Sequence, residues 1–174
     1  MINTRGYTLV ETLVVIGLFT VISFFSVQFF LGTLTGRAKA AAHIEIQEQA
    51  RAAAHWITYE LRRSRGFELT SDFGVNLASV TGSTLDLDTA VVGHDPTTFD
   101  IAAGILRLTY GAVSPMDITS DDVQVTNLVF TDLSSSNGKS LQAQFTITIE
   151  KQDPTGNPTP LSYTLTSTVE LRDR

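Results

Sequence analysis

The spacing of hydrophobic positions changes twice along this chain, and each change marks a different expected element. The first stretch, from Leu13 to Leu31, contains no charged residue and is apolar on every side. As a helix it would cover about 28 Å, close to the thickness of a bilayer's hydrocarbon core. A helix that is apolar all round belongs in lipid or inside a bundle. The pattern therefore predicts a membrane-length helix over 7–31.

The second stretch, over 37–65, lacks Pro and Gly and carries apolar residues at helical spacing. These residues are Ile46, Ala50, Ala53, Ala54, Ile57 and Leu61. Such a stripe is expected to face a hydrophobic core. Between the two stretches, Gly32 and Gly36 are expected to kink or locally melt the helix, because glycine is a poor helix former. Gly66 is expected to end an outer amphipathic helix over 32–66.

From position 67 onward the spacing becomes two, as in strands of an antiparallel sheet with one buried face. The clearest alternations are at 85–88, 141–150 and 161–171. In the first of these, Asp86 and Asp88 are expected to face outward. The alternation slips by one residue around Thr126 and Asn127, which predicts a bulge or bend.

One helical stripe and the apolar face of one meandering sheet can cover each other. The sequence thus predicts an α+β fold, with a β-rich head over 67–174 built on the outer half of a long N-terminal helix. The chain has 174 residues and no cysteine, so the head must be held by packing. Of the formal net charge of −6, residues 1–66 contribute +3 and residues 67–174 contribute −9. An acidic head repels phosphate, so we expect no direct nucleic acid binding.

The start of the apolar run contains an acidic residue, Glu11. A carboxylate there costs several kcal/mol in lipid unless something pairs with it, so its presence requires a partner. A secretory signal peptide is a poor alternative, because its apolar core spans only about 7–15 residues. Here the run is longer and includes Glu11.

The residues around Glu11 form a recognisable motif. Gly6, an aromatic residue at Tyr7, Thr-Leu-Val-Glu and a long apolar run resemble the amino terminus of type IV prepilins and type II secretion pseudopilins. The resemblance implies that a membrane peptidase removes 1–6 as a leader, cutting between Gly6 and Tyr7, and that Tyr7 becomes N-methylated. It also implies that Glu11 is an assembly residue. One departure is Tyr7, where the family usually has Phe. The late strands look most like those of minor J-type or W-type subunits.

This resemblance implies a structural subunit of a type IV pilus-like or type II secretion filament. Such a subunit would be single-pass in the cytoplasmic (inner) membrane, with its head outside the cytoplasm. Its partners would be prepilin peptidase, other pilin or pseudopilin subunits, the inner-membrane assembly platform and the lipid bilayer. The alternative is a membrane-anchored extracytoplasmic binding module that does not polymerise. An anchor needs neither Gly6 nor Glu11.

No constellation in the sequence predicts catalysis, a cofactor or a metal site. The histidines are His43, His55 and His94, and the two on the helix are too far apart to share an ion. No serine lies in a strand–turn–helix elbow beside a plausible base. Four aspartates could offer oxygen ligands to calcium, although their spacing matches no EF-type loop. They are Asp86, Asp88, Asp121 and Asp122.

Overall fold

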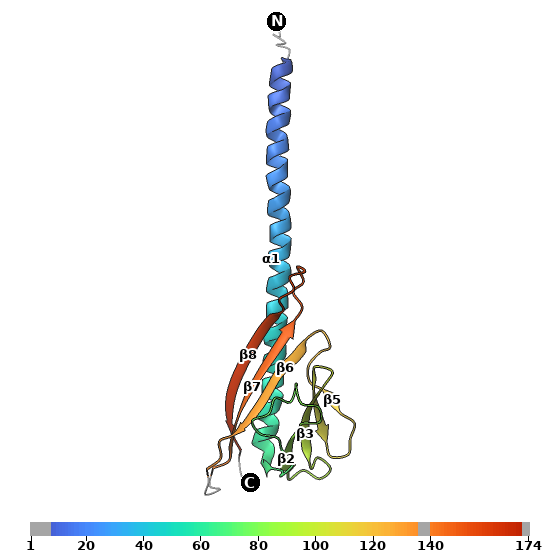
Figure 1. Cartoon of the computed structure of the whole chain (residues 1–174), viewed down its shortest axis with the longest axis vertical. Helices are drawn as coiled ribbons and strands as arrows, with labels where there is room; N and C mark the ends of the chain where they lie inside the picture. Colours follow the sequence, from blue (N-terminus) through green and yellow to red (C-terminus); the bar gives the residue numbers. More distant parts are fainter. Residues whose placement is uncertain (1–7, 136–139, 172–174) are drawn as a thin grey trace.

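The computed structural model describes residues 8–135 and 140–171. Within these ranges the chain forms one long helix followed only by strands (Figure 1). The elements are α1 (Leu9–Arg63), β1 (Ser64–Phe67), β2 (Leu85–Thr89), β3 (Thr97–Ala102), β4 (Ile105–Tyr110), β5 (Met116–Asp117), β6 (Gln124–Asp132), β7 (Gln142–Lys151) and β8 (Leu161–Glu170). This arrangement confirms the α+β prediction.

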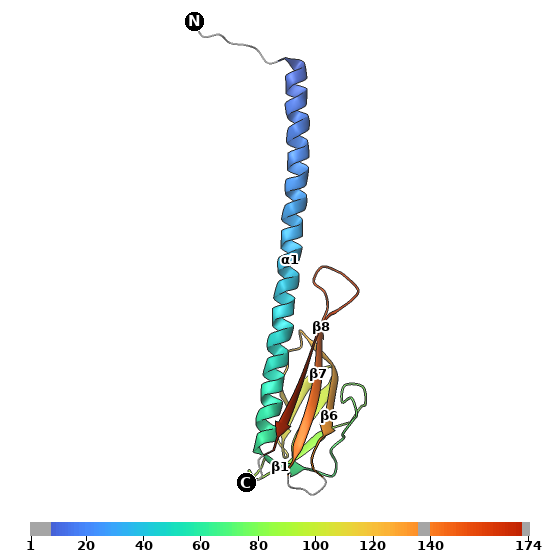
Figure 2. The same ribbon diagram turned by 90° about the vertical axis from the view of Figure 1, so that its left-hand side faces the viewer.

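Helix α1 is continuous over 55 residues and shows no sharp bend (Figures 1 and 2), so the kink or local melting predicted at Gly32 and Gly36 is wrong. A glycine costs about 1 kcal/mol of helix propensity, but it keeps the backbone N–H that bonds to the carbonyl four residues earlier. The predicted stop at Gly66 is also wrong. The helix ends at Arg63, with Ser64 as an extended cap whose N–H donates to the carbonyl oxygen of Glu60, and Gly66 lies in β1.

The helical stripe forms one side of the hydrophobic core, as predicted. Its five fully buried members are Ile46, Ala50, Ala53, Ile57 and Leu61. Ala54 lies at the margin of the stripe, where it is half-buried and packs against the core. The facing side chains come from both groups of strands, including Phe99, Phe130 and Phe145. The outer part of α1 is therefore an integral part of the head.

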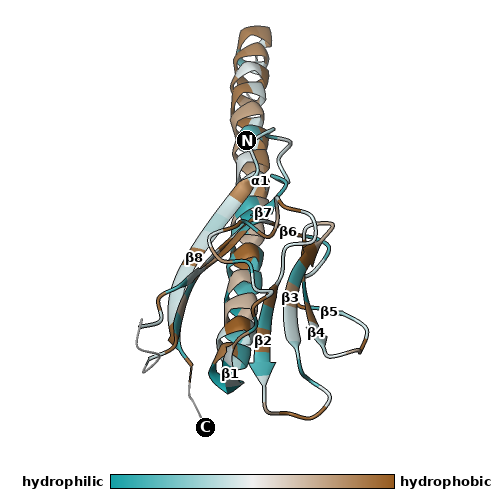
Figure 3. Ribbon diagram, turned by 60° about the horizontal axis from the view of Figure 1, so that its bottom comes forward, coloured by the Kyte–Doolittle hydropathy of each residue, from teal (hydrophilic) through white to brown (hydrophobic). Residues whose placement is uncertain are grey.

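The strands form two antiparallel sheets, whereas the sequence predicted one. The first has the order β1-β2-β3-β4-β5 and the second the order β6-β7-β8. Figure 3 shows the two sheets arranged around the outer part of α1. The chain leaves the first sheet at β5, which is only two residues long, and enters the second at β6. The outer edge of β6 bonds instead to the segment 74–77, and not to a strand of the first sheet.

The second sheet agrees closely with the predicted alternation. The inward side chains of β7 are fully buried, namely Ala143, Phe145, Ile147 and Ile149. The pairing of β6 with β7 shifts between Val125 and Asn127, which confirms the predicted bulge. The inward residues of β8 are less well covered than those of β7, since only Val169 is fully buried among them.

Asp86 is buried, with 8% of its surface exposed, so the prediction that it faces outward is wrong. The segment after β1 folds over this part of β2, where Ser71 Oγ donates to the carbonyl oxygen of Asp86 at 2.6 Å. The carboxylate accepts hydrogen bonds from Thr84 Oγ1 at 3.0 Å and Thr98 Oγ1 at 2.7 Å. These bonds make its burial possible.

Two ion pairs attach the end of β7 and the loop after it to α1. Lys151 Nζ lies 2.6 Å from Glu45 Oε1, and Lys39 Nζ lies 3.0 Å from Asp153 Oδ2. Asp153 is buried, and its Oδ1 also accepts from the N–H and hydroxyl of Thr155 at 2.9 and 2.7 Å. The bonds from Thr155, and then Lys39, lower the pKa of Asp153 to about 2.

We expect this attachment to weaken in acid. Because the pKa of Asp153 is lower in the folded chain than its ordinary value of 3.8, its ionised form stabilises the fold above that pH. The stabilisation is lost as the pH falls through about 2. Thermal unfolding should therefore show Asp153→Asn destabilising the head at pH 6 and having little effect at pH 2. The exposed control Asp122→Asn should change little at either pH, and an equal loss for Asp153→Asn at both would contradict the assignment.

Candidate functional site: the apolar half of the helix

The first half of α1 projects beyond the head (Figures 1 and 2). Exposure of its large apolar residues ranges from 78% at Leu9 to 46% at Leu34. Figure 3 colours this half mostly as hydrophobic, with paler turns between, whereas the outer half mixes hydrophobic and hydrophilic residues. Within the described chain it is the one helix long and apolar enough to cross a membrane. This agrees with single-pass membrane anchoring near the N-terminus.

Several hydroxyl groups in this half donate to carbonyl oxygens of the helix itself. Thr20 donates to the Ile16 carbonyl at 2.8 Å, Ser26 to Ile22 at 2.8 Å, and Thr33 to Phe29 at 2.9 Å. A hydroxyl without a partner would be costly in lipid, where no water can replace the bond. These polar residues are therefore compatible with a membrane-spanning segment.

Glu11 lies in the first turn of α1, exposed on the surface of the apolar half. Its backbone N–H donates to Oγ1 of the cap residue Thr8 at 3.3 Å. No residue within 8–135 or 140–171 forms an ion pair or hydrogen bond with its carboxylate. The carboxylate is therefore free to meet a group outside this part of the chain. Gly6 and Tyr7 lie outside the described residues, so the cleavage site and N-methylation stay predictions.

The residues considered as metal ligands are dispersed over the head. His43 and His55 are exposed on α1, whereas the ring of His94 stacks on Tyr110 with centroids 4.2 Å apart. Within the described chain, one group of acidic side chains has ligand atoms within 4.8 Å of one another: Glu68, Asp88 and Asp95. Asp88 is the single residue of the four considered for calcium that belongs to it.

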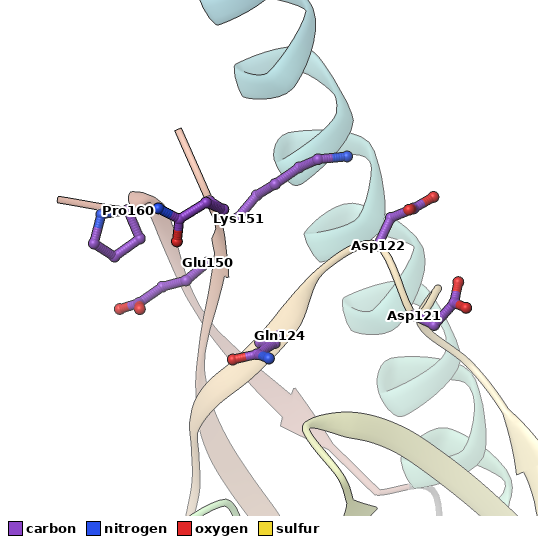
Figure 4. Close-up of a pocket in the computed structure, with 7 residues that line it drawn as sticks. Asp121, Asp122, Gln124, Glu150, Lys151 and Pro160 are labelled. Atoms are coloured by element: carbon purple, nitrogen blue, oxygen red, sulfur yellow. The ribbon is translucent and has the colours of Figure 1, made fainter. Parts of the chain in front are cut away.

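Asp121 and Asp122 border a different pocket, of about 250 Å³, between β6 and the end of β7. Figure 4 shows their carboxylates pointing to one side and that of Glu150 pointing to the other. The Lys151 ammonium reaches from this pocket toward α1, where it pairs with Glu45. The three carboxylates do not converge on one point, so this arrangement does not form a cation site.

The sequence interpretation missed a cluster of aromatic side chains near the end of α1. A pocket of about 290 Å³ is lined by His55, Trp56, Tyr59, Arg63 and Tyr110. The Arg63 guanidinium lies 5.2 Å from the centre of the Tyr59 ring, and Trp56 meets the same residue edge to face. The helical spacing of Trp56, Tyr59 and Arg63 predicts that they share one face of α1. It gave no indication that Tyr110, much further along the chain, would complete the cluster.

Glu60 lies beneath this cluster, 3% exposed, although most buried helix positions are apolar. Its Oε1 accepts a hydrogen bond from the Tyr110 hydroxyl at 2.7 Å and lies 3.6 Å from the Arg63 guanidinium. Burial, followed by the bond to Glu60, raises the pKa of Tyr110 well above its usual range. The contact joins the end of α1 to β4.

Comparison of the chain with protein-family models, with curated proteins and with solved structures found no match. The shape, one long apolar N-terminal helix on antiparallel sheets, is compatible with a pilin-like fold.

Proposed function

We propose that this protein is a structural subunit, a minor pilin or pseudopilin, of a type IV pilus-like or type II secretion filament. The observation that carries the proposal is the free carboxylate of Glu11 at the start of an exposed, membrane-length helix. The prepilin-type residues Gly6 and Tyr7 come just before Thr8, the N-cap of this helix, in the sequence. On this proposal prepilin peptidase cuts after Gly6. Before assembly, the subunit is anchored in the inner membrane with its head outside the cytoplasm.

The pairing of Glu11 would occur between subunits. Cleavage after Gly6 leaves an amine at Tyr7, and both the amine and the Glu11 carboxylate are costly in lipid when left alone. A neighbouring subunit that brings its amino terminus to Glu11 satisfies both groups. Desolvation offsets much of the attraction, so the pair determines the register of assembly more than its net stability. Other pilin or pseudopilin subunits and the assembly platform are the partners this requires.

A membrane-anchored binding module that does not polymerise would use the same helix differently. Its apolar half would only need to span lipid, and Glu11 would remain without a partner there. Because an unpaired carboxylate is costly in that environment, an anchor has no use for this residue. We therefore favour the filament subunit, which uses both Glu11 and the residues before it.

Intact mass spectrometry of the protein extracted from membranes tests the proposal directly. We expect loss of Met1 to Gly6 and the addition of one methyl group at Tyr7. Gly6→Leu should prevent the cut and leave the full-length chain in the membrane, because a bulky side chain replaces the glycine at the cleavage site. A wild-type protein that begins at Met1, or near Ala42, would contradict the prepilin assignment.

A further inference from the structure

The two edges of the β6-β7-β8 sheet differ in how they are protected. The outer edge of β6 is covered by the segment 74–77. Gly74 N donates to the Phe130 carbonyl at 2.7 Å, and Leu77 N donates to the Leu128 carbonyl at 2.9 Å. The Asn76 side chain forms two more hydrogen bonds with β6: its Nδ2 donates to the Thr126 carbonyl, and its Oδ1 accepts from the Leu128 N–H. This edge is therefore closed to another strand.

The outer edge of β8 has no such cover within the described chain. Leu171 N donates to the carbonyl of Leu141, the residue directly across from it. In an antiparallel pair the residues alternate, so odd-numbered residues of β8 bond to β7 and even-numbered residues direct their backbone groups away. The even-numbered residues are Ser162, Thr164, Thr166, Thr168 and Glu170. None of their N–H groups donates to another described residue.

This edge also lacks the features that usually prevent strand addition. Strand β8 is ten residues long, contains no proline or lysine, and pairs with β7 without a register shift. Natural edge strands are commonly short, bulged, charged or covered, because a row of unpaired backbone groups is a template for another strand. Figure 2, which faces this edge, shows β8 lying uncovered beside α1.

The side chains next to this edge are also incompletely covered, as expected if a further strand can bind there. The inward residues of β7 are fully buried, whereas Leu161, Tyr163 and Leu165 of β8 are only half-buried. On the outer face, the hydroxyls of Thr146 and Thr166 bond across the two strands at 3.0 Å. One further strand would bury the inner residues and continue the row of hydroxyls.

We propose that the free edge of β8 accepts an antiparallel strand from a different protein, whose side chains alternate between apolar and neutral polar. The apolar ones would lie over Leu161, Tyr163 and Leu165, and the polar ones beside the threonines. Main-chain hydrogen bonds supply recognition in such strand addition, and the alternate side chains supply specificity.

A second copy of this chain does not fit the edge. Antiparallel pairing of β8 with itself requires a two-fold axis perpendicular to the sheet. Because β8 runs alongside α1, that axis would reverse the second helix, and two copies anchored in one membrane cannot adopt this arrangement. This step rests on the membrane anchoring proposed above. The other described edges of a copy are also unsuitable, since β1 has four residues, β5 has two and β6 is covered.

The test uses the full-length protein in detergent micelles and a synthetic peptide of alternating threonine and valine with a lysine at each end. We expect saturable binding, with hydrogen exchange of the Thr164, Thr166 and Thr168 amides slowed by about tenfold or more. Amides of odd-numbered β8 residues should change little, because β7 already protects them. Thr166→Pro removes an outward N–H and should weaken binding by about tenfold, whereas Thr166→Ala keeps that N–H and should bind within about threefold.

Three results would overturn the proposal. The first is equal binding by a peptide N-methylated at alternate residues, which cannot form the backbone ladder. The second is equal binding by the Thr166→Pro and Thr166→Ala proteins. The third is protection of the same amides by raising the protein concentration without peptide, which would identify a second copy as the occupant. These readouts do not depend on cleavage at Gly6 or on Glu11, so the outcome is separate from that of the filament proposal.

Discussion

Ile147→Asp should unfold the head, whereas Thr148→Asp on the same strand should be tolerated. Ile147 is fully buried in the middle of β7, between Leu128 of β6 and Leu165 of β8. An unpaired carboxylate there costs several kcal/mol, a large part of a typical total stability of about 5–15 kcal/mol. Thr148 lies on the opposite face, half-buried, where its hydroxyl bonds to that of Thr164 at 2.9 Å.

Circular dichroism and urea unfolding of the two full-length variants in detergent would measure this difference. The helix signal should persist in both proteins, because the apolar half of α1 remains in the micelle. We expect the β signal and the cooperative unfolding transition to be lost in Ile147→Asp alone. Similar transitions in the two variants would show that the two faces of β7 do not differ in burial.

Glu11→Ala should remove the subunit from filaments while leaving membrane insertion and cleavage after Gly6 intact. The substitution makes the apolar half of α1 more hydrophobic, so insertion has no reason to fail. Assembly differs, because removing one partner of a buried ion pair typically costs about 3–5 kcal/mol. A loss of that size lowers incorporation by about a hundredfold or more.

The measurement is the amount of this subunit, relative to the major subunit, in filaments sheared from cells. Gln28→Ala is a matched control, because it removes an exposed polar side chain from the same half of the helix. It should leave incorporation unchanged. If Glu11→Ala protein enters filaments at the wild-type ratio, Glu11 is not an assembly residue, and a subunit that needs no such pairing becomes the better explanation.

The elements with a sustained hydrophobic period were predictable from the sequence. The stripe from Ile46 to Leu61 and the alternation of β7 are both found buried as expected. The period reports which face of an element is apolar, but it does not report which element covers that face. This is why the division into two sheets, and the burial of Asp86 beneath the segment around Ser71, could not be predicted.

In the candidate site, too, one feature could be predicted from the sequence and another could not. Glu11 was conspicuous because a charge interrupted an apolar run, and the helix places it on the exposed surface of that run. The Glu60–Tyr110 contact gave no comparable signal, since its two residues are fifty positions apart and each is ordinary in its own element. Long-range pairs of single residues leave no periodic trace in a sequence.

The unbroken course of α1 has a mechanical consequence. Between Leu31, where the apolar run ends, and Lys39, where the first ion pair to the head is made, lie seven residues that include Gly32 and Gly36. A force that pulls the head away from the bilayer would pass through this stretch, which only its own helical hydrogen bonds hold. It should be the first part to yield, and full extension would lengthen it by about 13 Å while lipid and head each stay intact. These seven residues would then act as a reversibly extensible linker between the membrane-embedded part of α1 and a head under load.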